Sequence, residues 1–317
     1  SYLGGVYDDY GKSIAVNAKG DIYATGCTKS SGWLSGGWDA TFNGNEDGYV
    51  VKFNSAGAHL WSSYLGGISN DGANKVAVNS SGDVLITGYT KSSGWASGGS
   101  DVSYNGLNDG FVVKLSPAGS HRWSSFLGGP ADDFGFGVTS DSEKNIYLTG
   151  QTSSLGWVTG GIDTTQNGEN DAYIVKLNSS GALQWSSYFG GIENDEGYGI
   201  AVDTTGNVYA TGNTASYGWV SGGPDTTLSG GHDGYILKLD ASGAHLWSSF
   251  LGGIDTDSAA GIALDSVGSI FVTGTSDSIG WLTGGWDTTH NGSSDGFVLK
   301  IDLRAKTAAT AWSNYSD

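Results

Sequence analysis

Three sets of aspartates recur along the chain and are its clearest candidates for chemistry. The first set follows LGG-type motifs and comprises Asp9, Asp71, Asp133, Asp195 and Asp257. The second set follows SGG-type or TGG-type motifs and comprises Asp39, Asp101, Asp163, Asp225 and Asp287. The third set directly precedes apolar runs and comprises Asp47, Asp109, Asp171, Asp233 and Asp295.

Carboxylates in glycine-rich loops suit a hard cation, so the set that includes Asp9 is a hypothetical calcium site. The competing interpretation is that each aspartate accepts hydrogen bonds from nearby loop amides. The spacing matches neither an EF-hand nor a nonapeptide calcium repeat. Calcium is the one cofactor that the sequence suggests.

Five tryptophans stand in glycine-rich segments together with the second aspartate set. They are Trp33, Trp95, Trp157, Trp219 and Trp281. An exposed indole beside carboxylate and hydroxyl groups is typical of sugar binding, because C–H groups stack on the ring and polar groups bind hydroxyls. These tryptophans and the set that includes Asp39 are therefore the predicted ligand-binding residues. The competing interpretation is that each tryptophan fills the gap between repeats and holds its own loop. Trp38 and Trp286 are not repeated, and we expect them to face solvent.

The remaining repeated tryptophans and lysines are more typical of structural residues than of catalytic ones. A second group of tryptophans precedes SS or SN pairs and is expected to pack: Trp61, Trp123, Trp185, Trp247 and Trp312. The lysines of VVK-type runs need a partner if they are buried, and we expect ion pairs between repeats with the set that includes Asp9. These lysines are Lys52, Lys114, Lys176, Lys238 and Lys300.

Catalytic and zinc-binding patterns are missing from the sequence. The five histidines are scattered over different repeats, and the single cysteine, Cys27, is replaced in the other repeats. A glycosidase needs two carboxylates in different environments, whereas most carboxylates here recur five times. No GxSxG or HExxH motif occurs in a supporting context. We therefore expect a protein that is not an enzyme, with a glycosidase as the less favoured alternative.

A period of 62 residues separates the successive loop tryptophans, from Trp33 to Trp281, and indicates a repeat architecture. Each repeat reads as four short strands rich in Val, Ile, Tyr, Phe and Trp, bounded by Gly, Asn, Asp and Ser. In the second repeat the expected strands are 75–79, 83–90, 109–116 and 121–129. Two connections in each repeat are short and two are long, so the tryptophan loop and the LGG link are expected on the same face, with the tryptophans near the Asp9 set.

Such units cannot each bury their apolar faces alone, and radial stacking of them gives a propeller. The sequence predicts an all-β, five-bladed β-propeller that forms a closed ring and a single domain over 1–317. The expected units are 6–67, 68–129, 130–191, 192–253 and 254–317, with 1–5 completing the ring. An open solenoid is disfavoured because the two ends supply parts of the same strand.

The motif LGGxxxDxxxxxIAVDxxGNIYxTGxTxS, followed by DGFVVKLxxxGxxxWSSYLGG, resembles the SBBP beta-propeller repeats of bacterial and archaeal surface or secreted proteins. LGGPADDFG at 127–135 and AVDTTGNVYATGNT at 201–214 carry the resemblance. The longer GWxSGG segment departs from the DFPTT-like segment usual in that family. The resemblance implies a propeller in an extracellular, cell-surface or periplasmic setting, and no particular activity.

The overall charge limits the partners. With 32 acidic residues against 14 Lys and Arg, the formal net charge is -18. The chain should repel phosphate backbones, so nucleic acid is not an expected partner. No apolar run is long enough to span a membrane.

The sequence favours a lectin-like binding module for a glycan or cell-surface polysaccharide; the alternative is a structural or adhesion module that contacts protein.

Overall fold

The computed structural model describes residues 2–301, which form β-strands joined by turns and loops, with no helix in that range. The strands of the first two repeats are β1 (Asp9–Val16), β2 (Ile22–Thr28), β3 (Asp47–Phe53), β4 (His59–Leu65), β5 (Asp71–Val78), β6 (Val84–Thr90), β7 (Asp109–Leu115) and β8 (His121–Leu127). The next two repeats contain β9 (Asp133–Ser140), β10 (Ile146–Thr152), β11 (Asp171–Leu177), β12 (Leu183–Phe189), β13 (Asp195–Val202), β14 (Val208–Thr214), β15 (Asp233–Leu239) and β16 (His245–Leu251). The last repeat contains β17 (Asp257–Leu264), β18 (Ile270–Ser276) and β19 (Asp295–Ile301).

Each repeat is one sheet whose strands follow each other in chain order. Four sheets have four strands, and the last, β17-β18-β19, has three within the described residues. The pairs with a determined register are antiparallel, as in β6 with β7, where Val84 pairs with Leu115 and Thr90 with Asp109. The prediction of an all-β chain built from propeller-type repeats is therefore confirmed.

The first strand of the second repeat begins at Asp71, four residues before the predicted start. Glycine and asparagine have poor strand propensity, so DGAN does not read as a strand. The structure pairs these residues with the end of β6 and accommodates them by a register shift between Ala73 and Lys75. The other three predicted strands of this repeat agree with the structure to within two residues.

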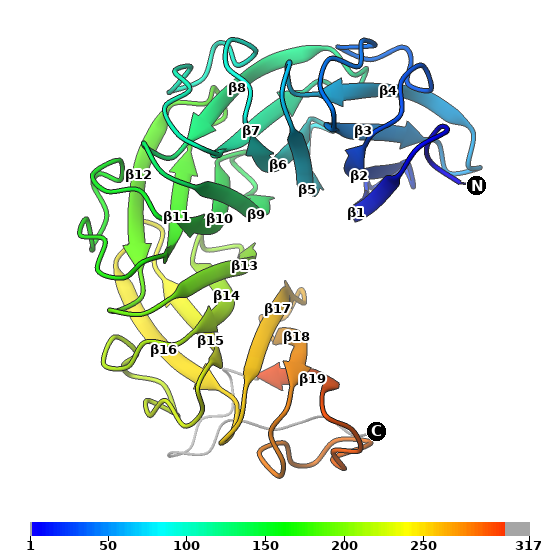
Figure 1. Ribbon diagram of the computed structural model, residues 1–317. Coiled ribbons are helices and arrows are strands. Elements are labelled where there is room, and N and C mark those ends of the chain that lie inside the picture. The colour runs from blue at the N-terminus through cyan, green and yellow to red at the C-terminus, as the bar shows by residue number, and fades with distance from the viewer. Residues whose placement is uncertain (1, 302–317) are drawn as a thin grey trace. The chain divides into compact units, whose positions relative to one another are not determined.

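The described chain divides into two compact units, residues 2–157 with 175–184, and residues 158–174 with 185–301. In the first unit, the first strands β1, β5 and β9 lie on one side and the fourth strands β4 and β8 on the opposite side (Figure 1). The apolar core lies between sheets: Tyr23, Val50 and Trp61 of the first repeat pack with apolar residues of the second. In the second unit, Tyr209 and Ile236 pack in the same way against the last repeat.

The fourth-strand tryptophans are packing residues, as expected. Trp61 and Trp123 are 4% and 5% exposed. The Trp61 indole lies over Gly119 of the next repeat, where an added Cβ would come within 2.7 Å of the ring. Its Nε1 donates a hydrogen bond to the carbonyl oxygen of Pro117 at 3.0 Å. Trp312 lies outside the described residues.

The predicted lysine partner is wrong. Lys52 pairs with Asp21 and Lys114 with Asp83, each at 3.1 Å and each within its own repeat. The contact that Lys52 makes with the next repeat is a hydrogen bond to the carbonyl oxygen of Pro117. Asp9 is at the opposite end of the sheet, since it pairs with Thr28 while Lys52 pairs with Tyr23 near the other end.

Candidate functional site

A threonine hydroxyl at the end of the second strand joins the loop tryptophan to the first aspartate set. In the second repeat, Trp95 Nε1 donates to Thr90 Oγ1 at 3.1 Å. The Thr90 hydroxyl in turn donates to Asp71 Oδ1. The Ser92 hydroxyl and the Gly67 amide donate to Asp71 Oδ2 at 2.8 and 2.7 Å. Both oxygens of this buried carboxylate therefore accept hydrogen bonds from the protein.

The tryptophan-to-hydroxyl bond recurs in every repeat, at 2.8 to 3.1 Å. The pairs are Trp33–Thr28, Trp95–Thr90, Trp157–Thr152, Trp219–Thr214 and Trp281–Ser276. The prediction that these tryptophans lie near the Asp9 set is confirmed. The hydroxyls were missed as functional residues, although the T-x-S or S-x-S pattern that supplies them recurs with the same period.

Packing also holds the tryptophan loop in place. All five loop indoles are half-buried. The Trp95 ring packs edge-on against Phe111 with centroids 5.2 Å apart, and Trp33 packs in the same way against Tyr49. A short parallel bridge between Gly98 and Ser124 fixes the loop along β8. These contacts favour the interpretation that the tryptophans hold their own loops.

The aspartates of the second set form turns through one carboxylate oxygen, and in Asp39 the other oxygen also accepts a hydrogen bond, from the Asn43 side chain. Asp101 Oδ1 accepts a hydrogen bond from the Ser103 amide at 2.8 Å, while the Asp101 carbonyl accepts one from the Phe126 amide. Within residues 2–301, the Oδ2 atom of Asp101 has no hydrogen-bond partner. The corresponding Oδ1 contact is made by each other member: Asp39, Asp163, Asp225 and Asp287. Four of the five side chains are half-buried and Asp287 is exposed.

The third aspartate set fastens the far end of the loop. Asp47 Oδ2 accepts from the Asn43 amide at 2.9 Å and Oδ1 from the Gly44 amide at 3.1 Å. Equivalent bonds from Asn105 to Asp109 and from Asn167 to Asp171 bind the next two loops. The aspartates of this set therefore hold the end of the loop by accepting hydrogen bonds from its backbone amides.

Burial changes the acidity of the first and third sets. Desolvation raises the pKa of Asp133 to about 7 and that of Asp195 to about 6, although hydroxyl and amide donors act in the opposite direction. Desolvation likewise raises the pKa of Asp47 to about 7. No group of three or more His, Cys, Asp or Glu side chains suited to a metal lies within residues 2–301. The calcium site stays a prediction, without an assembled set of ligands to support it.

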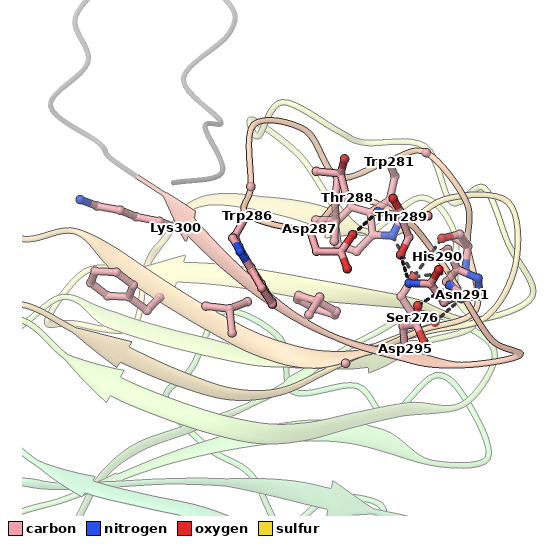
Figure 2. A pocket seen from close by; sticks show the side chains of 18 residues that line it. Ser276, Trp281, Trp286, Asp287, Thr288, Thr289, His290, Asn291, Asp295 and Lys300 are labelled. Carbon is pink, nitrogen blue, oxygen red and sulfur yellow. Dashed lines mark hydrogen bonds between the residues drawn. The ribbon is translucent and has the colours of Figure 1, made fainter. Parts of the chain in front are cut away.

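A cavity of about 520 Å³ opens in the last repeat and brings together Trp281, Asp287, Trp286 and His290. Figure 2 shows Trp286 beside the sheet, and His290 with Asn291 on the loop near Ser276 and Asp295. His290 Nε2 lies 3.0 Å from the Ser276 carbonyl oxygen. Of the predicted ligand-binding residues, this cavity joins Trp281 with Asp287.

The two unrepeated tryptophans have different surroundings. Trp286 is 95% exposed, as predicted. The prediction for Trp38 is wrong, because its ring stacks on His121 of the next repeat with centroids 4.2 Å apart. It also packs near Trp95, at 6.3 Å. Trp286 occupies the corresponding position in the last repeat, where it lines the cavity.

Comparison with known families agrees with this architecture. The SBBP beta-propeller repeat model matches residues 122–156, 184–218 and 246–280, and these segments are SBBP beta-propeller repeats. A beta-propeller domain of unknown function (DUF5122) matches residues 156–183, between the first two of these segments. The family resemblance inferred from the motifs is thus confirmed.

Two curated relatives are similar over much of the chain. Regulatory protein FlaEY of Caulobacter vibrioides is 25% identical over 98% of this chain and 34% of its own length. The uncharacterized WD repeat-containing protein L264 of Acanthamoeba polyphaga mimivirus is 26% identical over 51% of this chain and 13% of its own length. The chain therefore spans about a third or less of these relatives.

Among solved structures, a protein from Lactobacillus plantarum aligns with 96% of this chain and 71% of its own at 13% identity and a TM-score of 0.45. Residues 2–301 contain no helix of the length and apolarity needed to cross a membrane.

Proposed function

We propose that the chain is a closed five-bladed propeller that acts outside the cytoplasm as a non-enzymatic binding module. One observation carries the proposal: the repeated carboxylates, hydroxyls and indoles are hydrogen-bonded to one another and to the loop backbone. A carboxylate such as that of Asp71, which already accepts bonds from Thr90, Ser92 and Gly67, serves to build the loop face. Long loops held on a rigid sheet are the usual place for binding residues.

Closure of the ring is supported by apolar faces that no other residue of the described range 2–301 covers. In the first repeat Ile14 is 68% exposed, whereas its counterparts Val76 and Val138 are 3% and 4% exposed. In the last repeat Val298 is 71% exposed, whereas its counterpart Val112 is fully buried. Exposed apolar faces of this kind favour association with a complementary face.

The contact of Trp38 with His121 suggests how the ring would close. By the repeat period, Trp286 of the last blade corresponds to Trp38, and His59 of the first blade corresponds to His121. His59 is exposed. In a closed ring, Trp286 stacks on His59 and the cavity beside Trp286 is filled.

A disulfide test follows from this pairing. The variant His59→Cys/Trp286→Cys, in a Cys27→Ser background, should form an intramolecular disulfide on mild oxidation and remain monomeric. The control Leu60→Cys/Trp286→Cys moves one cysteine to the adjacent position, where the pairing of β3 with β4 shifts register, and should cross-link less. Disulfide-linked dimers, or no cross-link in the first variant, would contradict closure within one chain.

The more specific proposal is that the tryptophan loops bind carbohydrate. It is supported by the Oδ2 atom of Asp101, which has no hydrogen-bond partner within residues 2–301 and lies in a loop that carries the half-buried Trp95. Five near-equivalent weak sites would reinforce one another on a polysaccharide. Contact with a protein surface, as in an adhesion module, is the alternative for the same face.

A glycan array with the whole chain, with and without calcium, tests the lectin proposal. Asp→Asn substitution at all five positions of the second set keeps the Oδ1 acceptor and removes the charge. Loss of glycan binding with an unchanged melting temperature supports the site. If no glycan is bound under either condition, the lectin proposal fails and the adhesion alternative is preferred.

A further inference from the structure

A few positions vary between repeats although the surrounding residues are nearly constant. The residues directly after the first aspartate set are Tyr10, Gly72, Phe134, Glu196 and Ser258. Their cross-strand partners on the second strands are Cys27, Tyr89, Gln151, Asn213 and Thr275. The residues directly before the third aspartate set are Glu46, Asn108, Asn170, His232 and Ser294. The repeated hydrogen bonds do not depend on the residue type at these positions. Their side chains can therefore form a binding site that occurs once in the chain rather than in every repeat.

In the first unit, the varying side chains come together. The Tyr89 hydroxyl donates to Glu46 Oε1 at 3.3 Å. The Tyr89 ring packs edge-on against Phe134 with centroids 5.6 Å apart, and Phe134 stacks on Phe136 at 6.1 Å. Glu46, Tyr89 and Phe134 come from three successive repeats, so the cluster spans their boundary.

The missing side chain at Gly72 makes room for Tyr89. A Cβ added at Gly72 would lie 2.5 Å from Cε1 of the Tyr89 ring. Tyr10, the counterpart of Gly72 in the first repeat, is 49% exposed. Because cross-strand partners share a face, Tyr10 lies on the same side of its sheet as Cys27, which neighbours Glu46.

The cluster contains a carboxylate without a cation. Glu46 is half-buried and makes no ion pair with any residue of the described range 2–301. Lys12, two residues after Tyr10, is exposed and is also outside any ion pair in that range. Burial and the nearby Glu46 raise the pKa of the Cys27 thiol to about 11 and raise the pKa of Tyr89 as well, so both groups stay neutral at pH 7.

We propose that Glu46, Tyr89 and Phe134, flanked by Tyr10, form a binding site for the ammonium group of an alkylamine. The carboxylate supplies the opposite charge and a hydrogen-bond acceptor, and the aromatic rings attract a cation through their faces. The net charge of -18 raises the local concentration of cations around the molecule. None of the loop tryptophans is part of this site, and its test uses an alkylamine, so the result does not depend on glycan binding.

The test is an NMR titration of the whole chain with n-butylammonium chloride, with 1-butanol as the uncharged counterpart. Butylammonium should shift the ring resonances of Tyr89 and Phe134 in a saturable way, and butanol should not. The substitution Glu46→Gln retains an acceptor for Tyr89 and should weaken binding at least tenfold. The matched control Glu169→Gln removes the same charge from an exposed loop position of the third repeat and should leave binding unchanged.

Two further variants separate a binding site from general electrostatics. Gly72→Ala should displace the Tyr89 ring and weaken binding, while Lys12→Ala should strengthen it by removing a competing cation. Melting temperatures close to the unsubstituted chain show that each variant is folded. No saturable shift with butylammonium, equal binding of butanol, or equal losses in Glu46→Gln and Glu169→Gln would overturn the proposal.

Discussion

At the scale of single residues, one hydroxyl connects most of the repeated motif. Thr90 Oγ1 accepts from the Ser92 amide at 2.9 Å and from Trp95 Nε1 at 3.1 Å, and it donates to Asp71. The last repeat uses Ser276 in the same place, with the same bond from Trp281. The bond from the indole therefore requires a hydroxyl rather than a threonine methyl group, although Asp257 Oδ1 has no hydrogen-bond partner within residues 2–301.

Thr90→Val should destabilise the chain by about 3 kcal/mol, because it leaves a buried carboxylate and an indole N–H without their partner. Thr90→Ser should cost less than about 1 kcal/mol, as the natural serine in the last repeat indicates. Urea unfolding of both variants measures the difference. Equal stabilities would show that the hydroxyl bonds contribute nothing.

A second residue-scale feature is an aspartate that stands at the start of a turn in one repeat and at the end of the equivalent turn in another. The turn after β1 carries Asn17 and Asp21, whereas the turn after β13 carries Asp203 and Asn207. In the first, Asp21 pairs with Lys52. In the second, Asp203 accepts a hydrogen bond from the Tyr209 hydroxyl at 3.1 Å. Either position supplies one acidic group at the end of the sheet where the repeated lysine lies.

At the scale of elements, a glycine turn and a tryptophan hold neighbouring repeats together. Gly119, with φ of 81°, presents its bare Cα to the Trp61 ring, and Gly181 does the same for Trp123. Gly57 has the same conformation in the first repeat, with φ of 80°, but no heavy atom within 4 Å of an added Cβ. Among residues 2–301, no tryptophan lies over this turn of the first repeat.

Alanine substitutions at matched glycines measure this contact. Gly94→Ala, at φ of 78° with nothing within 4 Å of the new Cβ, should cost about 1 kcal/mol from backbone strain alone. Gly119→Ala should cost about 3 kcal/mol, since the methyl group also collides with Trp61. In a closed ring Gly57→Ala should resemble Gly119→Ala, and in an open one it should resemble Gly94→Ala. Thermal unfolding of the three variants distinguishes these outcomes.

At the scale of the whole molecule, the buried carboxyl groups and the large negative charge both lower the stability of the chain as pH rises. Burial raises the pKa of Asp47 and Asp133 to about 7, and that of Asp109 and Asp195 to about 6. A carboxyl group whose pKa is raised by folding binds more protons in the folded state, so its contribution to stability is lost as pH rises through the folded pKa. Repulsion among the surface charges also grows over this range.

The melting temperature should therefore be higher at pH 5 than at pH 8, by roughly 5 to 10 °C for a chain of this size. Added salt should reduce the share of this difference that comes from exposed charges. It should leave the share that comes from the buried carboxylates. Asp133→Asn should reduce the remaining dependence of the melting temperature on pH, because it removes one of the four buried carboxyl groups. A melting temperature that rises from pH 5 to pH 8 would contradict this assignment. Scanning calorimetry at both pH values provides the measurement.

The sequence by itself determined the repeat and most of its strands. The period that relates Trp33 to Trp281 and the β-branched runs between turns identify each strand, because local propensity and hydrogen-bonded turns act over a few residues. The same pattern predicted that Trp95 and Asp71 lie together. It did so because the connections of an antiparallel meander fall on alternate faces.

The tertiary structure decided which atoms meet. Trp38 and Trp286 have the same neighbours in sequence, Gly before and Asp after, yet one stacks on His121 and the other is exposed. The partner of Lys52 was likewise decided by which end of the sheet each residue occupies. Contacts between repeats join residues some 60 positions apart, such as Trp61 with Pro117, and only the packing of one sheet on the next brings them together.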